Sequence, residues 1–279
     1  MTLASLMVRL TAGASNDAIL RFAANAVVQF GVGRVIGISA CQPVQVYVSP
    51  DAYVPADLIE QDFERIDKDL KEAEKAFRSA MEGKAKSIEW RSTALAFGTI
   101  ADYVAQQMRA ADLLVTAAEG ASSLFDSGRH VDLADLVLRA GRPVLIPGIG
   151  IDKLDLTSVV LGWKDTREAR RAAEGALPLL KLAGRVTVVE VAAKDDLGDA
   201  RKRTEDVSTW LAGHGVKASA CAIEAVQDDP AEIEAIAKQL LAGLIVGGAY
   251  GHTRVREWVL GGVTRDLLLR PVGCSLLAH

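Results

Sequence analysis

The sequence predicts an α/β protein made of two tandem doubly wound domains, each an open five-stranded parallel sheet with helices on both faces. Three observations predict this fold class. Short segments of strand character alternate with longer segments whose apolar residues recur at helical spacing. The same order of segments occurs twice along the chain. Some strand segments, such as 144–147 and 244–248, are almost entirely apolar, which is typical of strands buried on both faces.

The first half contains all the segments of one such domain. In chain order we expect a strand at 5–10, a helix at 16–30, a strand at 34–40, a helix at 57–83, a strand at 86–94, a shorter helix, a strand at 111–118, and a last helix followed by a strand at 144–147. The helix at 57–83 carries interspersed acids and bases, which predicts a solvated face. It should end near Gly83, because glycine readily adopts the left-handed conformation found at helix ends.

The second half repeats this order. We expect a strand at 158–164, a helix at 166–183, a strand at 185–191, a polar helix, a strand at 217–225, a shorter helix, a strand at 242–249, a helix at 264–270, and a strand at 272–279. Asp165 and Glu168 have the spacing of a capping box and predict the start of the first of these helices. Turn formers and charges interrupt the pattern at 147–155, so this segment is predicted to link domains at 1–147 and 156–279.

Composition disfavours several classes of function. The length of 279 residues suits roughly two domains. A net charge of −4 provides no basic field for nucleic acid. No apolar run approaches the ~18 residues of a membrane span, so a membrane partner is not expected. Cys41, Cys221 and Cys274 are odd in number and far apart, which indicates reduced thiols in a cytoplasmic protein. The four histidines lack metal-binding spacing, and we predict no metal site.

The most informative motif begins at the end of the strand at 242–249. Gly248 and Gly251 follow the apolar run directly. Since glycine has no Cβ, both can adopt a positive φ and let backbone amides approach an anion closely. A strand end followed by such a turn is a common geometry for holding phosphate, although two tight turns beside a helix would give the same pattern.

A second glycine pair continues the motif. Gly261 and Gly262 precede Val263, Thr264 and the helical segment 264–270. The first amides of that helix lack intrahelical partners and lie at the positive end of its dipole. The Thr264 hydroxyl would add another donor, so this segment also favours a phosphate site.

An internal alignment indicates that the first half has lost this motif. A shift of 131 residues places 111–115 over 242–246. At that shift the counterparts of Gly248, Gly251, Gly261, Gly262 and Thr264 are Ala117, Gly120, His130, Val131 and Leu133, respectively. Because one glycine of four survives, we expect at most one nucleotide site per chain, in the second half.

Trp163 and Lys164 form a further candidate contact. They end the first strand of the second half, and the carboxyl edge of an open α/β sheet is where ligands bind. Trp163 could pack near a base and Lys164 near ribose or phosphate. The alternative is a half-buried tryptophan beside a solvated lysine. No Gly-Lys-Ser/Thr phosphate loop and no Gly-x-Ser-x-Gly nucleophile motif is present.

With these motifs in place, the chain resembles the universal stress protein family in its tandem two-domain bacterial form. The resemblance is strong over 156–279 and weaker over 1–147. ATP-binding members carry Gly-x2-Gly-x9-Gly followed by Ser or Thr, and Gly248, Gly251 and Gly261 match that spacing. Gly262 replaces the Ser or Thr, which removes one phosphate hydroxyl, while the next two residues continue as in binding members.

The resemblance implies an adenine nucleotide alpha hydrolase-like fold and a nucleotide site in the second domain. Binding members usually have an aspartate after the first strand, where this chain has Lys164 with Asp165 one place on. Val191, at the end of the second strand, would line the adenine pocket, and His252 lies within the glycine segment. The implied cofactor is ATP or another adenine nucleotide, with or without magnesium. The closing strand at 272–279 is expected to pair with another domain, in this chain or in a homo-oligomer.

The function expected from these features is that of a cytoplasmic stress-associated protein, a sensor or regulator rather than a fast catalyst. Two alternatives stay open. One is a nucleotide-independent protein-interaction module, because one half is degenerate and the other lacks two polar contacts. The other is a slow ATP hydrolase, for which His252, Glu257 and Asp266 are unpersuasive candidate bases. We therefore assign no catalytic residue.

Overall fold

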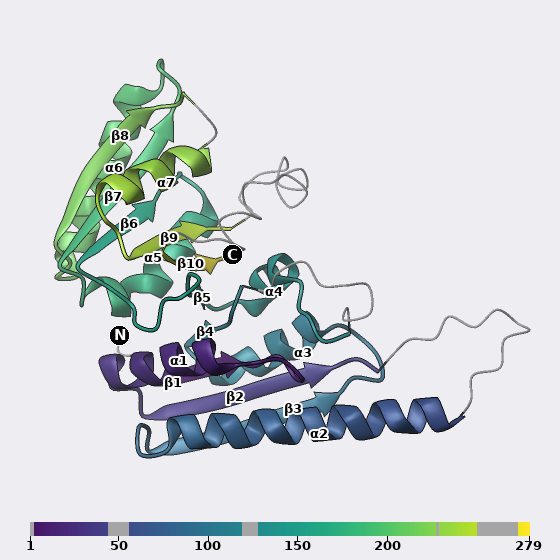
Figure 1. The fold of residues 1–279 in the computed structure, drawn as a ribbon. Coiled ribbons are helices and arrows are strands. Elements are labelled where there is room, and N and C mark those ends of the chain that lie inside the picture. Colours follow the sequence, from purple (N-terminus) through teal and green to yellow (C-terminus); the bar gives the residue numbers. More distant parts are fainter. Residues whose placement is uncertain (1–2, 44–55, 119–127, 227–228, 250–272) are drawn as a thin grey trace, which may run out of the picture.

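The computed structural model describes residues 3–43, 56–118, 128–226, 229–249 and 273–279 (Figure 1). In this part of the chain ten strands form one sheet, in the order β3-β2-β1-β4-β5-β10-β9-β6-β7-β8. Strands β1 to β5 are parallel to one another, and so are β6 to β10. The predicted fold class of two five-stranded parallel sheets is therefore confirmed.

The first half follows the predicted order of elements. Its strands are β1 (Ser5–Arg9), β2 (Arg34–Cys41), β3 (Ser87–Ala94), β4 (Leu113–Val115) and β5 (Val144–Ile146), and its helices are α1 (Asp17–Phe30), α2 (Ala56–Met81), α3 (Ile100–Gln107), the 3₁₀ turn η1 (Met108–Ala110) and α4 (Leu133–Ala140). Alternate residues of β1 face opposite sides, as the two-residue period of a strand requires. Leu6 and Val8 pack with α1 and α2, whereas Met7 packs with α3 and α4.

The second half is built in the same way. Its strands are β6 (Ser158–Gly162), β7 (Arg185–Ala192), β8 (Ala218–Glu224), β9 (Leu244–Gly248) and β10 (Cys274–Ala278), and its described helices are α5 (Arg167–Leu180), α6 (Leu197–Gly213) and α7 (Asp229–Gln239). Helices α5 and α6 cover one face and α7 lies on the other. The predicted helix at 264–270 lies outside the described residues.

The two half-sheets join through their last strands. β10 pairs with β5 in the antiparallel direction, with Leu276 opposite Leu145 (Figure 1). These two leucines hold equivalent positions, because Val144 pairs with Leu114 in the first half as Ser275 pairs with Ile245 in the second, 131 residues later. Equivalent residues that pair with each other across an antiparallel ladder define a local two-fold axis. The chain is thus an internal dimer of its two halves, and one apolar core cluster extends through both.

Side chains of α1 hold the segment that links β5 to β6. Arg21 Nε lies 3.2 Å from the Asp152 carboxylate, and Asn25 donates to the Asp152 carbonyl at 2.8 Å. Gln29 donates to the Leu154 carbonyl at 3.1 Å, and the Leu154 side chain is buried in the core. The link is therefore packed against the first half.

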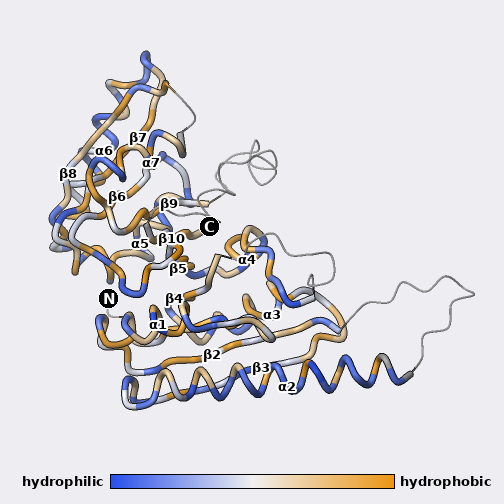
Figure 2. Tube along the Cα trace, in the orientation of Figure 1, coloured by the Kyte–Doolittle hydropathy of each residue, from blue (hydrophilic) through white to orange (hydrophobic). Residues whose placement is uncertain are grey.

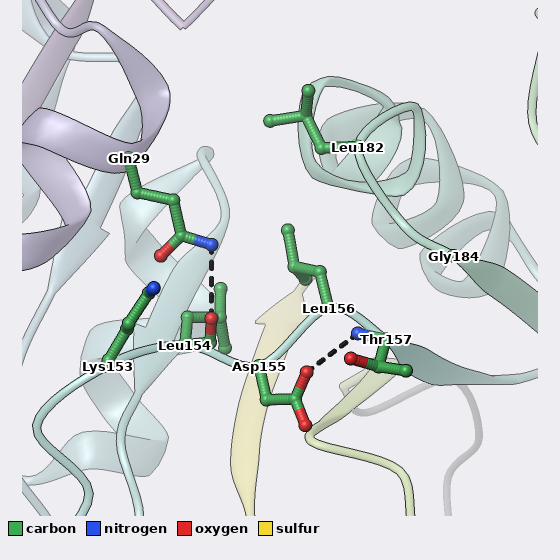
Figure 3. Close-up of a pocket in the computed structure, with 8 residues that line it drawn as sticks. All are labelled: Gln29, Lys153, Leu154, Asp155, Leu156, Thr157, Leu182 and Gly184. Carbon is green, nitrogen blue, oxygen red and sulfur yellow. Dashed lines mark hydrogen bonds between the residues drawn. The ribbon is translucent and has the colours of Figure 1, made fainter.

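A cavity of about 610 Å³ opens between this link and the turn after α5 (Figure 3). Figure 3 shows Gln29 on one side, Leu156 and Leu182 on the other, and Asp155 below, where its carboxylate accepts a hydrogen bond from the Thr157 amide at 2.8 Å. A hydrogen bond from the Thr157 side chain and this one from its amide hold the pKa of Asp155 below its usual range. The Asp155 carboxylate is thereby engaged in closing its own turn.

The helix ends show where local patterns succeed and where they fail. α2 ends within two residues of Gly83, which has a φ of +71°, as predicted. The capping box predicted for Asp165 and Glu168 is wrong by one residue. Thr166 has the extended conformation of an N-cap and its hydroxyl accepts from the Ala169 amide at 3.3 Å, whereas the Asp165 carboxylate accepts from Arg170.

The described helices do not include one that is both long and apolar enough to cross a membrane. Figure 2 shows that α2, the longest of them with 26 residues, alternates between hydrophilic and hydrophobic positions along its length. This amphipathic pattern places its apolar side on the sheet and its charges in solvent.

Candidate functional site

The candidate site lies at the carboxyl edge of the second half, where the strand order changes direction. β6 is paired with β7 on one side and with β9 on the other. After β6 the chain continues through α5 to β7, the neighbour of β6 on one side. The neighbour on the other side, β9, comes later in the sequence. In open α/β sheets such a switch point is the usual place for a ligand.

Five of the predicted site residues are described, and the structure brings them to this edge. Trp163, Lys164 and Asp165 follow β6, Val191 is near the end of β7, and Gly248 ends β9. The remaining predicted residues, Gly251, His252, Gly261, Gly262, Val263 and Thr264, lie outside the described residues.

Gly248 packs against the first turn of α5. A Cβ on this residue would lie 2.5 Å from the Ala169 amide nitrogen and 2.6 Å from the Glu168 carbonyl carbon, closer than real Cβ atoms approach. Gly248 is not among the glycines with a positive φ, so the conformation that its lack of a Cβ permits is not used at this position. The glycine is needed because the end of β9 touches helix backbone.

The next residue is held from both sides. The Ala249 amide donates to the Ala278 carbonyl at 2.8 Å, and its carbonyl lies 2.9 Å from His279 Nδ1. Arg171 of α5 donates to the His279 carbonyl at 3.0 Å. Since β9, β10 and α5 all contribute to these bonds, the glycine segment that follows Ala249 begins from a fixed point at the carboxyl edge.

Trp163 is buried at this edge and leaves one polar atom without a partner. Its amide donates to the Val189 carbonyl at 2.7 Å, and its ring is 9% exposed within the core beneath α5. Among the described residues its Nε1 has no hydrogen-bond partner, although it is fully shielded from solvent. A buried indole N–H usually finds an acceptor, so this one marks a place where an acceptor group can be received.

The residues after Trp163 turn sharply into α5. The Thr166 amide donates to the Lys164 carbonyl at 2.7 Å, and the Lys164 and Asp165 side chains are exposed. Asp165 forms a surface ion pair with Arg170 at 2.8 Å. Val191 is buried near the end of β7. Both charged side chains of this turn therefore lie at the surface of the carboxyl edge.

The sequence analysis missed a charged cluster close to Trp163. Glu190, buried in β7, accepts from Arg203 of α6 at 2.9 Å through Nε and at 2.6 Å through Nη2. Asp196 accepts from the same Nη2 at 2.7 Å. The hydrogen bonds to Glu190 and then to Asp196 raise the pKa of Arg203, which keeps the guanidinium protonated. One signal was present in the sequence, since Glu190 is a lone acid within the apolar run of its strand.

Comparison with solved structures identifies this architecture. No protein-family model matches the chain, and no curated protein matches it in sequence. A universal stress protein from Archaeoglobus fulgidus is similar with a TM-score of 0.70 and 14% identity, over 98% of this chain and 95% of that one. The chain has the universal stress protein fold, in a two-domain form.

Two proteins from Pseudomonas aeruginosa are similar over the same extent. One is described as functionally unknown and covers 99% of this chain and 92% of its own, with a TM-score of 0.57 and 15% identity. The other, a putative universal stress protein, covers 99% and 93% at the same TM-score and identity. At these identities the likeness concerns the fold.

In the first half of this universal stress protein fold, an ion pair lies beside the turn between β1 and α1. Arg129 forms an ion pair with Asp69 of α2, and the two side chains are 15% and 13% exposed. Arg129 also donates to the Ala12 carbonyl at 3.4 Å in the turn between β1 and α1. In the same turn Gly13 has a φ of +73°, and a Cβ there would lie 2.8 Å from the Asp69 carboxylate. The turn is thus pressed directly onto the ion pair.

Within the described ranges, no three His, Cys, Asp or Glu side chains are grouped so that they could hold a metal ion. Cys41, Cys221 and Cys274 are free thiols, and burial raises the pKa of both Cys41 and Cys274 to about 11. These two thiols remain protonated at neutral pH and are poor nucleophiles.

Proposed function

We propose that the second half binds ATP or a related adenine nucleotide, and that the protein acts in a stress response as a sensor or regulator rather than as a fast catalyst. The observation that carries the proposal is the position of Gly248. This first glycine of the Gly-x2-Gly-x9-Gly motif ends β9 at the switch point, beside the residues that follow β6. The two segments with ligand-binding character therefore start from adjacent strands.

The described residues fit such a ligand. Trp163 Nε1 is a buried donor without a partner in the described part of the chain, and a nucleotide offers many acceptors. Lys164 adds an exposed cation at the same edge, suited to a phosphate or a ribose oxygen. The backbone amides of the glycine segment would hold the phosphates, with Thr264 as an added hydroxyl donor. Asp165, Val191 and His252 complete the proposed set of contacts, with or without magnesium.

We further propose that 1–147 and 156–279 are the two domains, and that the first does not bind nucleotide. Arg129 and Asp69 lie against the β1–α1 turn of the first half, and the counterparts of the motif glycines are mostly other residues. One nucleotide per chain is therefore expected.

Two alternative functions are a nucleotide-independent interaction module and a slow ATP hydrolase. A nucleotide-independent interaction module would be favoured if the protein ignored ATP, since Gly262 replaces a phosphate-binding hydroxyl. A slow ATP hydrolase would need a base near the γ-phosphate, and His252, Glu257 and Asp266 are the candidates in the glycine segment and the predicted helix after it.

The deciding experiment is mass spectrometry of the small molecules released when the purified protein is denatured, together with calorimetric titration of ATP. About one adenine nucleotide per chain, or ATP binding with that stoichiometry, supports the proposal. An empty protein that also fails to bind added ATP contradicts it and favours a protein-interaction role.

A further inference from the structure

In the described part of the chain, the ten-stranded sheet ends at β3 on one side and at β8 on the other (Figure 1). An end strand leaves one row of main-chain amides and carbonyls without a partner strand, and proteins often protect such an edge with charged side chains. β3 is protected in this way. Near its centre Glu89 forms ion pairs with Arg34 at 2.6 Å and with Arg91 at 3.3 Å. A strand that paired with β3 would have to lie beside this charged network.

The edge at β8 has a different composition. The pairing registers of the two halves make Ser219 equivalent to Glu89 and Cys221 equivalent to Arg91. Apart from Glu224 at its end, β8 carries only small or apolar side chains. The charges that protect β3 are therefore replaced in β8 by residues that leave room for another strand.

The hydrogen bonds to β7 indicate which main-chain groups of β8 face outward. The Lys217 carbonyl accepts from the Val186 amide at 2.8 Å. The Ala225 amide donates to the Ala192 carbonyl at 2.9 Å. Because these groups alternate in direction along a strand, those of Cys221 also face β7. The residues whose amides and carbonyls face away from the sheet are therefore Ala218, Ala220, Ala222 and Glu224.

We propose that β8 pairs with β8 of a second copy of this chain, in the antiparallel direction, so that the sheet continues from one molecule into the next. The register that pairs the whole strand with itself centres on Cys221 and places Ala220 opposite Ala222 of the second copy. Both alanines have outward-facing main-chain groups, so each such pair can exchange hydrogen bonds in both directions. The two halves of the chain are already joined by an antiparallel pair of this kind, β5 with β10.

The side chains at the ends of β8 favour a second copy in this direction. Lys217 directly precedes the strand and Glu224 ends it, and both side chains are exposed. An antiparallel pair places the positive end of each strand beside the negative end of the other, whereas a parallel pair would place like charges together. Val226, which is 84% exposed, would lie beside Val216 of the second copy. β8 is therefore complementary to itself.

Sedimentation velocity of the full-length chain over a range of concentrations tests the proposal. We expect a reversible dimer with a micromolar dissociation constant, since one pair of edge strands forms a small interface. A protein that stays monomeric at submillimolar concentration overturns the proposal. Ala222→Pro should raise the dissociation constant at least about tenfold, because proline removes an outward-facing amide and leaves the bonds to β7 in place.

Ser92→Pro is the matched control, because Ser92 of β3 is equivalent to Ala222 of β8 and lies at the protected edge. It should leave the dissociation constant unchanged, and circular dichroism checks that both variants are folded. Equal effects of the two substitutions, or no effect of Ala222→Pro, overturn the proposal.

A charge exchange tests the direction of pairing without a proline. Lys217→Glu should weaken the association about threefold at low ionic strength, because it places two acids side by side. Adding Glu224→Lys to this variant should restore the association, since the charges are then exchanged between the two ends. An association that the second change does not restore overturns the proposal.

Cross-linking tests the register. In an antiparallel ladder, a residue pair without main-chain hydrogen bonds has its Cα atoms about 4.5 Å apart, which is within the reach of a disulfide. Mild oxidation with diamide should therefore link the dimer through Cys221. Cys221→Ser should prevent the link, since Cys41 and Cys274 are buried. A dimer that forms no link, or a link that persists in Cys221→Ser, overturns the proposal.

Discussion

The two halves share a frame, and they differ at the carboxyl edge of each sheet. In the first half, the Arg129–Asp69 ion pair lies against the β1–α1 turn at this edge. In the second half the same edge holds a buried tryptophan with a donor that lacks a partner among the described residues, and an exposed lysine. The sheet core is under a common packing constraint, whereas the turns at its edge are free to diverge and carry function.

The turns themselves show how the difference arises. Between β1 and α1 the chain is three residues longer than between β6 and α5. Asn16, before α1, bonds both the amide and the carbonyl of Thr11 at 2.9 Å and does not cap the helix. Thr166, before α5, uses its hydroxyl to cap. The turn between β1 and α1 is thus held by hydrogen bonds within itself, whereas the turn between β6 and α5 leads directly into a capped helix beside Gly248.

The largest expected effect concerns nucleotide binding. Gly251→Val and Gly261→Val should each weaken ATP binding at least about 100-fold, or about 2.8 kcal/mol, because a branched side chain keeps phosphate away from the amides. Gly120→Val is the matched control, since Gly120 is the counterpart of Gly251, and it should leave the affinity unchanged. Calorimetric titration measures the ATP affinity of the three variants. If all three bind ATP equally well, the proposed functional difference between the halves is contradicted.

A second comparison concerns equivalent residues of β7 and β2. Glu190→Gln should lower the free energy of unfolding by about 2–3 kcal/mol, because Arg203 loses its buried partner yet keeps Asp196. At the equivalent position Ser39 donates to the Leu10 carbonyl at 2.9 Å, and Ser39→Ala should cost about 1 kcal/mol.

Urea denaturation compares these two variants. The double variant Glu190→Leu with Arg203→Met serves as a control and should be near neutral, since an ion pair replaced as a whole leaves no stranded charge. Equal losses for Glu190→Gln and Ser39→Ala would show that the buried ion pair contributes no more than a single neutral hydrogen bond.

A third comparison concerns Gly248, at the end of β9, and its counterpart Ala117 in the first half. Gly248→Ala should destabilise the protein by about 1–3 kcal/mol, because its Cβ would meet the backbone of Glu168 and Ala169. The reverse change, Ala117→Gly, should cost about 0.5–1 kcal/mol through chain entropy alone. A neutral Gly248→Ala in thermal unfolding would contradict the close packing. Gly248→Val is consequently a poor probe of phosphate binding.

The smallest effect is a dependence on pH. Burial acts to raise the pKa of Glu168, but hydrogen bonds from its own amide and from Arg167 outweigh it and leave the pKa lowered. A lowered folded-state pKa stabilises the protein above the unfolded value of about 4.3, and this stabilisation is lost as the pH falls through the folded value.

Glu168→Gln should therefore be less stable than the wild type at neutral pH and converge with it in acid. Ala18, the counterpart of Glu168 in α1, is exposed, and Ala18→Glu should change stability by less than about 0.5 kcal/mol. Denaturation curves at pH 3 to 7 compare both variants with the wild type. If the difference in free energy of unfolding between Glu168→Gln and the wild type stays constant with pH, the lowered pKa of Glu168 is contradicted.

Much of the fold could be predicted because its signals are local. Strand and helix periods identify β1, α1 and β7 within a residue or two, and the apolar run before Gly248 identifies β9. The internal shift of 131 residues also predicts the register that relates β4 to β5 and β9 to β10. The apolar runs identify central strands such as β1 and β7 because these strands are buried on both faces.

The remainder depends on contacts between distant residues. Nothing near Asp69 in the sequence indicates that it meets Arg129, and nothing near Gly248 indicates the first turn of α5. The cap at Thr166 differs from the predicted one at Asp165 because the two neighbours have similar capping chemistry, and the backbone conformation decides between them.

The position of β10 has a consequence for how the molecule is assembled during synthesis. This strand follows every other strand in the chain, yet it lies between β5 and β9 near the middle of the sheet. Until it leaves the ribosome, β5 and β9 each present an unsatisfied edge, which can be captured by another nascent chain. Completion of the sheet therefore waits for residues 274–278.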